Sequence, residues 1–146
     1  MSWKQQLEEK IRNRTARVGV IGLGYVGLPL AVEFAKAGFT VTGIDVNEKK
    51  VARLNRGESY IQDVPSAAVE PLVRGGRLKA ASNFSVVGEL DTVDICVPTP
   101  LRKTKDPDMS YIVAACQEIA KHMHPGMLVI LESTTCLLYT SDAADE

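Results

Sequence analysis

Residues 22–27 read GLGYVG, a G-x-G-x-x-G motif placed directly after the apolar run of residues 18–21. Each glycine has a separate use in a turn that binds phosphate groups. Gly22 permits a tight turn, Gly24 leaves room for a pyrophosphate beside the backbone, and Gly27 lets a helix pack against a strand. A glycine-rich turn without a ligand is the alternative. A strand before the motif and a helix after it favour dinucleotide binding at the helix N-terminus.

Asp45 supplies the second half of this pattern, because it ends the next apolar run, residues 39–44. A carboxylate about 20 residues beyond the glycines accepts hydrogen bonds from both hydroxyls of an adenosine ribose. The same side chain could instead cap the helix that is expected to begin near Asn47. An acid here would also repel a 2′-phosphate, and no arginine follows it directly. The sequence therefore favours NAD over NADP.

The elements that must position these groups alternate along the chain. Helices are expected at residues 2–14, 28–37, 48–55, 65–74 and 110–123, and strands at residues 18–21, 39–44, 78–80, 93–97 and 127–131. Strands that alternate with helices predict an α/β fold of the Rossmann type, with a doubly wound parallel sheet. In the strand order 3-2-1-4-5-6 of such folds, this chain is expected to stop before the sixth strand.

Two threonines follow the expected fourth and fifth strands. Thr99 lies in a Pro-Thr-Pro sequence, and Thr134 lies in the sequence LESTT. Ligands of such sheets bind beyond the carboxyl ends of the strands, so both hydroxyls could reach the nicotinamide half of a dinucleotide. Ordinary turn chemistry explains threonine and proline at these positions equally well.

The first 16 residues are expected to form an appended amphipathic helix. Trp3, Leu7 and Ile11 recur at helical spacing on an otherwise charged segment. This helix precedes the first strand of the sheet, so it either packs on its own domain or contacts a partner subunit.

Composition excludes several other classes of protein. The chain has 146 residues, 45% of them hydrophobic, and a formal net charge of −1, which does not suggest a nucleic-acid partner. It has no apolar run of the roughly 20 residues that a membrane span needs, and no signal peptide is expected. The three cysteines, Cys96, Cys116 and Cys136, lack metal-ligand spacing. Cys96 and Cys116 are expected to be reduced core residues of a cytoplasmic protein.

Longer motifs carry a family resemblance. The strings GLGYVGLPLA, GIDVNEKKVARLNRGESYI, ICVPTPL and LESTT resemble the nucleotide-sugar dehydrogenases of the UDP-glucose/UDP-mannosaminuronate family, over residues 17–135. ESYIQDV and the VPTPLRKTKDPDMSYI loop are most similar to the UDP-N-acetylglucosamine 6-dehydrogenase branch. The resemblance implies oxidation of the C6 alcohol of a UDP-sugar to a carboxylate with two NAD, through a thiohemiacetal on a cysteine. It also implies polysaccharide biosynthesis and a homo-oligomer.

The resemblance assigns roles residue by residue. Val26 matches a backbone contact to NAD, Asp45 the ribose acid, and Lys50 its basic neighbour. Thr99 matches the threonine after the fourth strand, and Thr134 a threonine that contacts NAD and helps to place a catalytic water. Lys50 by itself would be interpreted as a solvated helix charge. The expected cofactor-binding residues are therefore Gly22, Gly24, Tyr25, Val26, Gly27, Asp45, Lys50, Thr99 and Thr134.

The sequence departs from this family towards its end. The family's nucleophilic cysteine, in a context like GGSCFPKD, and its UDP-binding domain are absent from these 146 residues, so no catalytic residue is expected here. The family continues LESTT with YPGTTEE, whereas residues 136–146 read CLLYTSDAADE. A DNA sequence that could encode this tail resembles a transposase adapter, so we expect a non-native end. A standalone dinucleotide-binding module and a 3-hydroxyacid dehydrogenase remain the alternatives.

Overall fold

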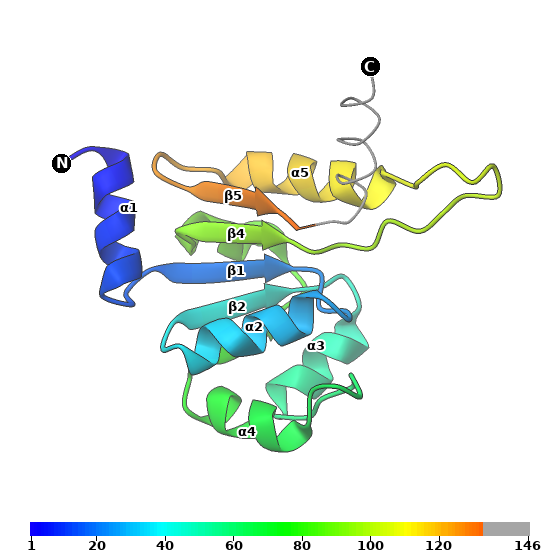
Figure 1. The fold of residues 1–146 in the computed structure, drawn as a ribbon, viewed down its shortest axis with the longest axis horizontal. Coiled ribbons are helices and arrows are strands. Elements are labelled where there is room, and N and C mark those ends of the chain that lie inside the picture. Colours follow the sequence, from blue (N-terminus) through cyan, green and yellow to red (C-terminus); the bar gives the residue numbers. More distant parts are fainter. Residues whose placement is uncertain (133–146) are drawn as a thin grey trace, which may run out of the picture.

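One parallel sheet organises the chain. The structure, a computed structural model, describes residues 1–132. Its strands are β1 (Arg17–Ile21), β2 (Thr40–Ile44), β3 (Leu78–Ala81), β4 (Thr92–Ile95) and β5 (Leu128–Leu131). They pair in the order β3-β2-β1-β4-β5, and every pair is parallel (Figure 1). The predicted fold class and strand order are therefore confirmed, while the predictions on Thr134 and on residues 136–146 lie outside the described residues.

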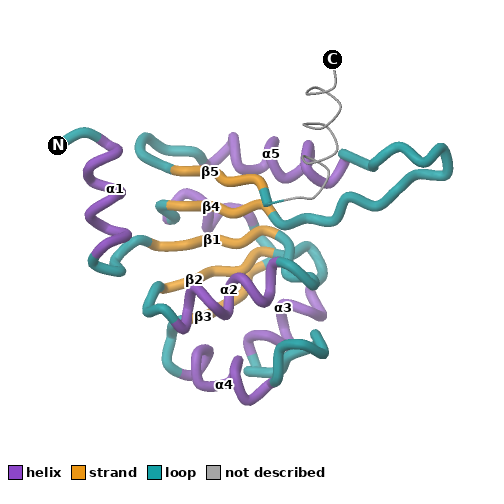
Figure 2. Tube along the Cα trace, viewed as in Figure 1, coloured by secondary structure: helices purple, strands orange, loops and turns teal. Residues whose placement is uncertain are grey.

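Helices pack around this sheet (Figure 2). They are α1 (Trp3–Arg12), α2 (Gly27–Lys36), α3 (Glu48–Asn55), α4 (Ser66–Arg74), α5 (Ser110–His122) and the short 3₁₀ helix η1 (Phe84–Glu89). One buried apolar cluster joins β1 and β2 to α2, α3 and α4, and a second joins β4 to α5 and η1. Both faces of the sheet are thus covered, as a doubly wound fold requires.

Polar caps decide where several of these elements begin. Ser2 and Gln5 form a reciprocal capping box at the start of α1. Asn47 caps α3, because its side-chain oxygen accepts hydrogen bonds from the N–H groups of Lys49 and Lys50. Asn83 caps η1, an element that the sequence pattern did not predict. A 3₁₀ helix of six residues is too short to show a periodic apolar pattern.

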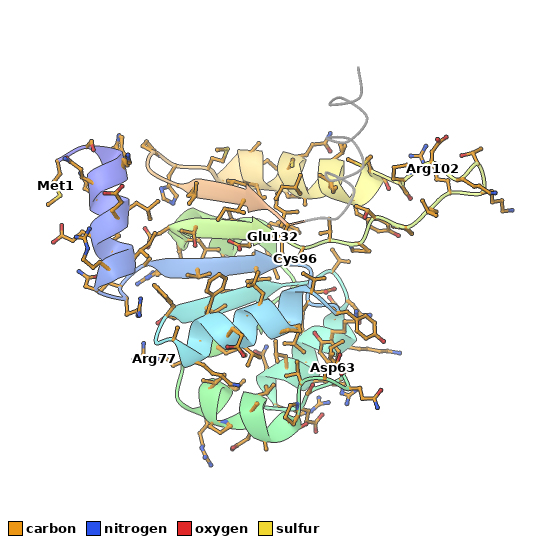
Figure 3. The ribbon with its side chains drawn as sticks, in the orientation of Figure 1. Met1, Asp63, Arg77, Cys96, Arg102 and Glu132 are labelled. Atoms are coloured by element: carbon orange, nitrogen blue, oxygen red, sulfur yellow. The ribbon has the colours of Figure 1, made fainter. Side chains whose placement is uncertain are left out.

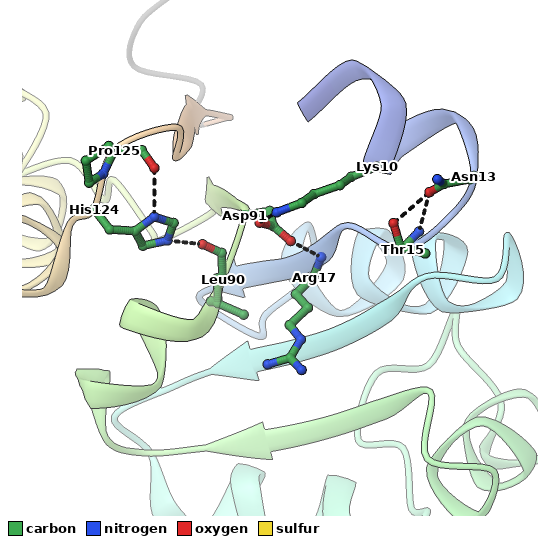
Figure 4. Close-up of polar contacts among 8 residues, drawn as sticks. All are labelled: Lys10, Asn13, Thr15, Arg17, Leu90, Asp91, His124 and Pro125. Carbon is green, nitrogen blue, oxygen red and sulfur yellow. Dashed lines mark hydrogen bonds and ion pairs between the residues drawn. The ribbon is translucent and has the colours of Figure 1, made fainter. Parts of the chain in front are cut away.

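The appended helix α1 is tied to its own domain through Asp91 (Figure 4). The carboxylate of Asp91 pairs with the Lys10 ammonium at 3.0 Å and accepts a hydrogen bond from the Arg17 N–H at 2.7 Å. No residue of α1 is buried, however, and the Trp3 side chain remains 59% exposed. The helix therefore packs on the edge of its domain and leaves much of its apolar stripe accessible.

The buried face of α5 differs from the predicted one. The sequence pattern predicts one apolar side formed by Ile112, Val113, Cys116, Ile119 and Ala120. In the structure Ile112, Ala115 and Ile119 are buried, while Val113 and Cys116 are exposed. The prediction that Cys116 is a core residue is therefore wrong. Small and apolar residues occur on both sides of this helix, so its periodicity did not determine which side faces the sheet.

The edge strand β5 leads to a prediction about solubility. In the described part of the chain, no strand pairs with its outer edge, and Leu128, Val129 and Leu131 are 36–40% exposed. An unpaired apolar edge is a template for association. We expect analytical ultracentrifugation to show mass that increases with concentration, and Val129→Lys to reduce that increase. A sharp monomer peak at all concentrations would contradict this expectation.

None of the helices in residues 1–132 has the length and apolarity to cross a membrane.

Candidate functional site

A cleft of about 720 Å³ lies at the carboxyl ends of β1, β2 and β4. This is the edge at which parallel α/β sheets bind their ligands. The predicted site residues that line the cleft are Gly22, Gly24, Tyr25, Val26, Asp45, Lys50 and Thr99. Gly27 is not among the residues that line the cleft, and Thr134 is outside the described residues. The structure thus brings together residues that are spread over three strand ends.

The three glycines of the turn each meet a different steric constraint. Gly22 has a φ of +94°, and a Cβ on it would lie 2.7 Å from the Cys96 carbonyl oxygen. A Cβ on Gly27 would collide with the carbonyl oxygen of Gly22. A Cβ on Gly24 would meet nothing within 4 Å, so this position opens towards the cleft. The geometry agrees with the use that the motif predicts for each glycine.

Backbone donors are available beside this open space. Gly22 N–H donates to Ile44 O at 2.8 Å and so joins the turn to β2. Among the described residues, the N–H groups of Gly24, Tyr25 and Val26 donate no hydrogen bond. They precede the first turn of α2, whose dipole favours an anion at this end. The residues present therefore fit the pyrophosphate of a dinucleotide.

Asp45 holds the turn in addition to facing the cleft. Its Oδ2 accepts a hydrogen bond from Leu23 N–H at 2.9 Å, and its Oδ1 accepts one from Asn47 N–H at 2.9 Å. The alternative that Asp45 caps the following helix is wrong, because Asn47 is the capping residue of α3. Each carboxylate oxygen has two lone pairs, so both can accept a further hydrogen bond from a ribose.

Lys50 lies against an aromatic ring rather than standing free in solvent. Its ammonium is 5.6 Å from the centroid of the Tyr60 ring, within the range of a cation–π contact. The guanidinium of Arg53 lies 5.9 Å from the same centroid. Lys50 also lines the cleft beside Asp45. The side chain is therefore placed where its charge could act on a bound anion.

Several residues line the cleft without a signal in the sequence motifs. They are Ser82, Phe84, Tyr111, Ala114 and Glu118. These residues come from the end of β3, from η1 and from α5, so only the folded chain brings them together. Ser82 alone follows a strand directly, and its position at a carboxyl end could have identified it.

The cysteine in the cleft is unsuited to nucleophilic chemistry. Cys96 follows β4 directly, and Figure 3 labels it near Glu132 at the same edge of the sheet. Burial raises the pKa of the Cys96 thiol to about 12, and the negative charges of Asp94 and Glu132 contribute. A thiol is a nucleophile only as the thiolate, so Cys96 remains protonated at neutral pH.

Comparison with known proteins gives this site a family. The NAD-binding domain of the UDP-glucose/GDP-mannose dehydrogenase family matches residues 16–144. UDP-N-acetyl-D-mannosamine dehydrogenase from Escherichia coli K12 is 41% identical over 131 residues, which cover 89% of this chain and 30% of that protein. UDP-N-acetyl-D-glucosamine 6-dehydrogenase from Pseudomonas aeruginosa is 40% identical over 124 residues, 81% of this chain and 27% of that protein. The chain thus spans less than a third of the length of these relatives.

Solved structures lead to the same family. NDP-N-acetyl-D-galactosaminuronic acid dehydrogenase from Methanosarcina mazei superposes with a TM-score of 0.79 at 35% identity, over 92% of this chain and 30% of that one. (S)-3-hydroxybutyryl-CoA dehydrogenase from Ralstonia eutropha has a TM-score of 0.56 at 16% identity over 80% of this chain and 40% of that one, a likeness of fold alone. The alternative of a 3-hydroxyacid dehydrogenase therefore has no support beyond the fold. The chain belongs to the UDP-glucose/GDP-mannose dehydrogenase family, within its NAD-binding domain.

Proposed function

We propose that this chain is the NAD-binding part of a longer dehydrogenase that oxidises the C6 alcohol of a UDP-N-acetylhexosamine to the carboxylate with two NAD. UDP-N-acetylglucosamine is the first candidate substrate. The observation that carries the proposal is the joint placement of the open Gly24 position and the Asp45 carboxylate in one cleft. The names of the relatives, which act on UDP-N-acetylated sugars, support the substrate class.

The residues of this chain would bind and orient the cofactor rather than perform the chemistry. The free N–H groups that precede α2 would hold the pyrophosphate, and Asp45 would hold the adenosine ribose, with Lys50 as its basic neighbour. Thr99 would contact the nicotinamide half, and the same role is proposed for Thr134, together with the placing of a catalytic water in the whole enzyme. NAD supplies the hydride acceptor when it is bound.

The setting of the whole enzyme is also part of the proposal. Cys96 and Cys116 are both free thiols, which supports a cytoplasmic location because that compartment keeps thiols reduced. We further propose a homo-oligomer in polysaccharide biosynthesis, as the family resemblance implies.

Calorimetry on this chain tests the proposal. We expect NAD to bind and Gly24→Asp to weaken binding by roughly tenfold or more, because a carboxylate would enter the space of the pyrophosphate. Gly88→Asp is the control, since a Cβ there meets only His122 O, at 3.8 Å, and the position needs no positive φ and lies outside the cleft. Equal affinities of the Gly24→Asp and Gly88→Asp variants would contradict the proposed site.

The chain alone should form no NADH when UDP-N-acetylglucosamine or UDP-N-acetylmannosamine is added with NAD, as followed by NADH fluorescence. Hydride transfer needs the sugar held beside the nicotinamide, and none of the three cysteines has the expected nucleophile context. Sugar-dependent NADH formation would place the catalytic groups within this chain and would contradict the proposal that these residues only bind and orient the cofactor.

A standalone dinucleotide-binding module would also form no NADH in this assay. An independent reading of the gene beyond Thr135 distinguishes these two alternatives.

A further inference from the structure

The peptide bond between Leu23 and Gly24 is held from one side by a residue outside the glycine motif. The Tyr60 hydroxyl donates a hydrogen bond to the Leu23 carbonyl oxygen at 2.6 Å. On the other side of the same residue, Leu23 N–H donates to Asp45 at 2.9 Å. The Leu23 side chain is fully buried, so this residue has little freedom to move.

Because the peptide bond is planar, the contact to the Leu23 carbonyl also sets the direction of the Gly24 N–H. In a trans peptide the N–H of one residue points opposite to the C=O of the residue before it. No described peptide bond is cis, so the hydrogen bond from Tyr60 to Leu23 O fixes the direction of Gly24 N–H. That N–H points away from Tyr60 and has no hydrogen-bond acceptor among the described residues.

The Tyr60 ring is itself held in place by the helix before it. Lys50 and Arg53 of α3 both lie over the ring, at 5.6 and 5.9 Å from its centroid. Arg53 also donates a hydrogen bond to Ser59 O at 3.0 Å, which fixes the backbone next to Tyr60. Burial, with the charge of Asp45, raises the pKa of the Tyr60 phenol, so the hydroxyl remains a donor throughout the neutral pH range.

We propose that Tyr60 is a positioning residue for the dinucleotide pyrophosphate, which acts by holding the Leu23 carbonyl so that Gly24 N–H is aimed at a phosphate oxygen. The inference rests on the proposed function of the cleft, since it needs NAD to bind there. It extends the binding site beyond the glycine motif to the loop that joins α3 to α4. The Tyr60 hydroxyl contacts the protein backbone and need not touch the cofactor.

Tyr60→Phe tests this proposal, because it removes the hydroxyl and keeps the ring under Lys50 and Arg53. We expect the affinities for NAD and ADP, measured by calorimetry, to fall roughly fivefold. Adenosine, which lacks the pyrophosphate, should bind equally well to both proteins in an NMR titration. Thr15→Val is the matched control, because it also removes one hydroxyl that donates a hydrogen bond at 2.6 Å (Figure 4). Thr15 precedes the amino end of β1 and does not line the cleft.

The outcomes are distinguishable. If the unmodified chain fails to bind NAD, the proposed function is wrong. If the chain binds NAD and Tyr60→Phe binds it equally well, the positioning role is wrong while the proposed function stands. An equal loss for ADP and adenosine would also overturn the inference, because it would indicate a general disturbance of the site. Thermal unfolding of each variant checks that the fold is retained.

Discussion

Asp45→Asn is expected to remove most of the chain's preference for NAD over NADP. A carboxylate beside a 2′-phosphate costs about 2–3 kcal/mol, which corresponds to a preference of roughly 30- to 150-fold. The asparagine removes the charge and keeps one oxygen that can accept the Leu23 N–H. We expect NADP affinity to rise and NAD affinity to fall, because the ribose loses a charged acceptor.

The structure adds a second variant to this experiment. Lys50 is the cation beside Asp45 in the cleft, whereas Arg53 is engaged with Ser59 O and with Glu58. In the Asp45→Asn background, Lys50→Ala should therefore lower NADP affinity more than NAD affinity. Asp45→Ala would be less informative, because it also removes the acceptor of the Leu23 and Asn47 N–H groups. Equal affinities of the unmodified chain for NAD and NADP, measured by calorimetry, would contradict the assignment of Asp45 as the residue that contacts the ribose.

A second large effect, on the free energy of unfolding, is expected for Asp94, a residue with no proposed role in cofactor binding. Asp94 lies within β4, between Val20 of β1 and Ile130 of β5 in the sheet register, and it is 2% exposed. No described residue donates a hydrogen bond to its carboxyl group. Burial, with the charge of Glu132, raises the pKa of Asp94 to about 6. A buried carboxylate without a donor destabilises the folded state when it is ionised.

The direction of the pH dependence follows from this raised pKa. An aspartate in the unfolded chain titrates near pH 4, so between about pH 4 and pH 6 the folded state retains a proton that the unfolded state has lost. The free energy of unfolding therefore falls as the pH rises through this window. Above about pH 6 the accumulated loss is constant, at about 3 kcal/mol.

Asp94→Asn should remove this loss. We expect the variant to raise the free energy of unfolding by about 2–3 kcal/mol at pH 8 and to change it little at pH 4. Urea unfolding at the two pH values measures the difference. Asp63→Asn, on an exposed loop (Figure 3), is the control and should have no such pH-dependent effect. Parallel stability curves for the Asp94→Asn variant and the unmodified chain would refute the role of Asp94.

Local pattern predicted the strands and the glycine turn, because each depends on residues that are close in sequence, whereas the strand order followed from the order that Rossmann folds share. Gly22, Gly24 and Asp45 could be identified since a strand end and a helix start fix their positions. The contact from Tyr60 to Leu23 could not, because it joins residues 37 apart through a loop whose path depends on packing. Asp94 was overlooked for a related reason. The sequence of an apolar strand does not reveal whether the fold will place a hydrogen-bond donor next to an acid within it.

The position of α1 has a practical consequence. The helix lies across the amino ends of the strands, held by the pair of Lys10 and Asp91, whereas the cleft opens at their carboxyl ends (Figure 1). A purification tag or a fluorescent label fused ahead of Met1 would therefore emerge at the far end of the molecule from the cofactor. Such a fusion could be attached to a sensor surface through its N-terminus with the cleft facing the solution.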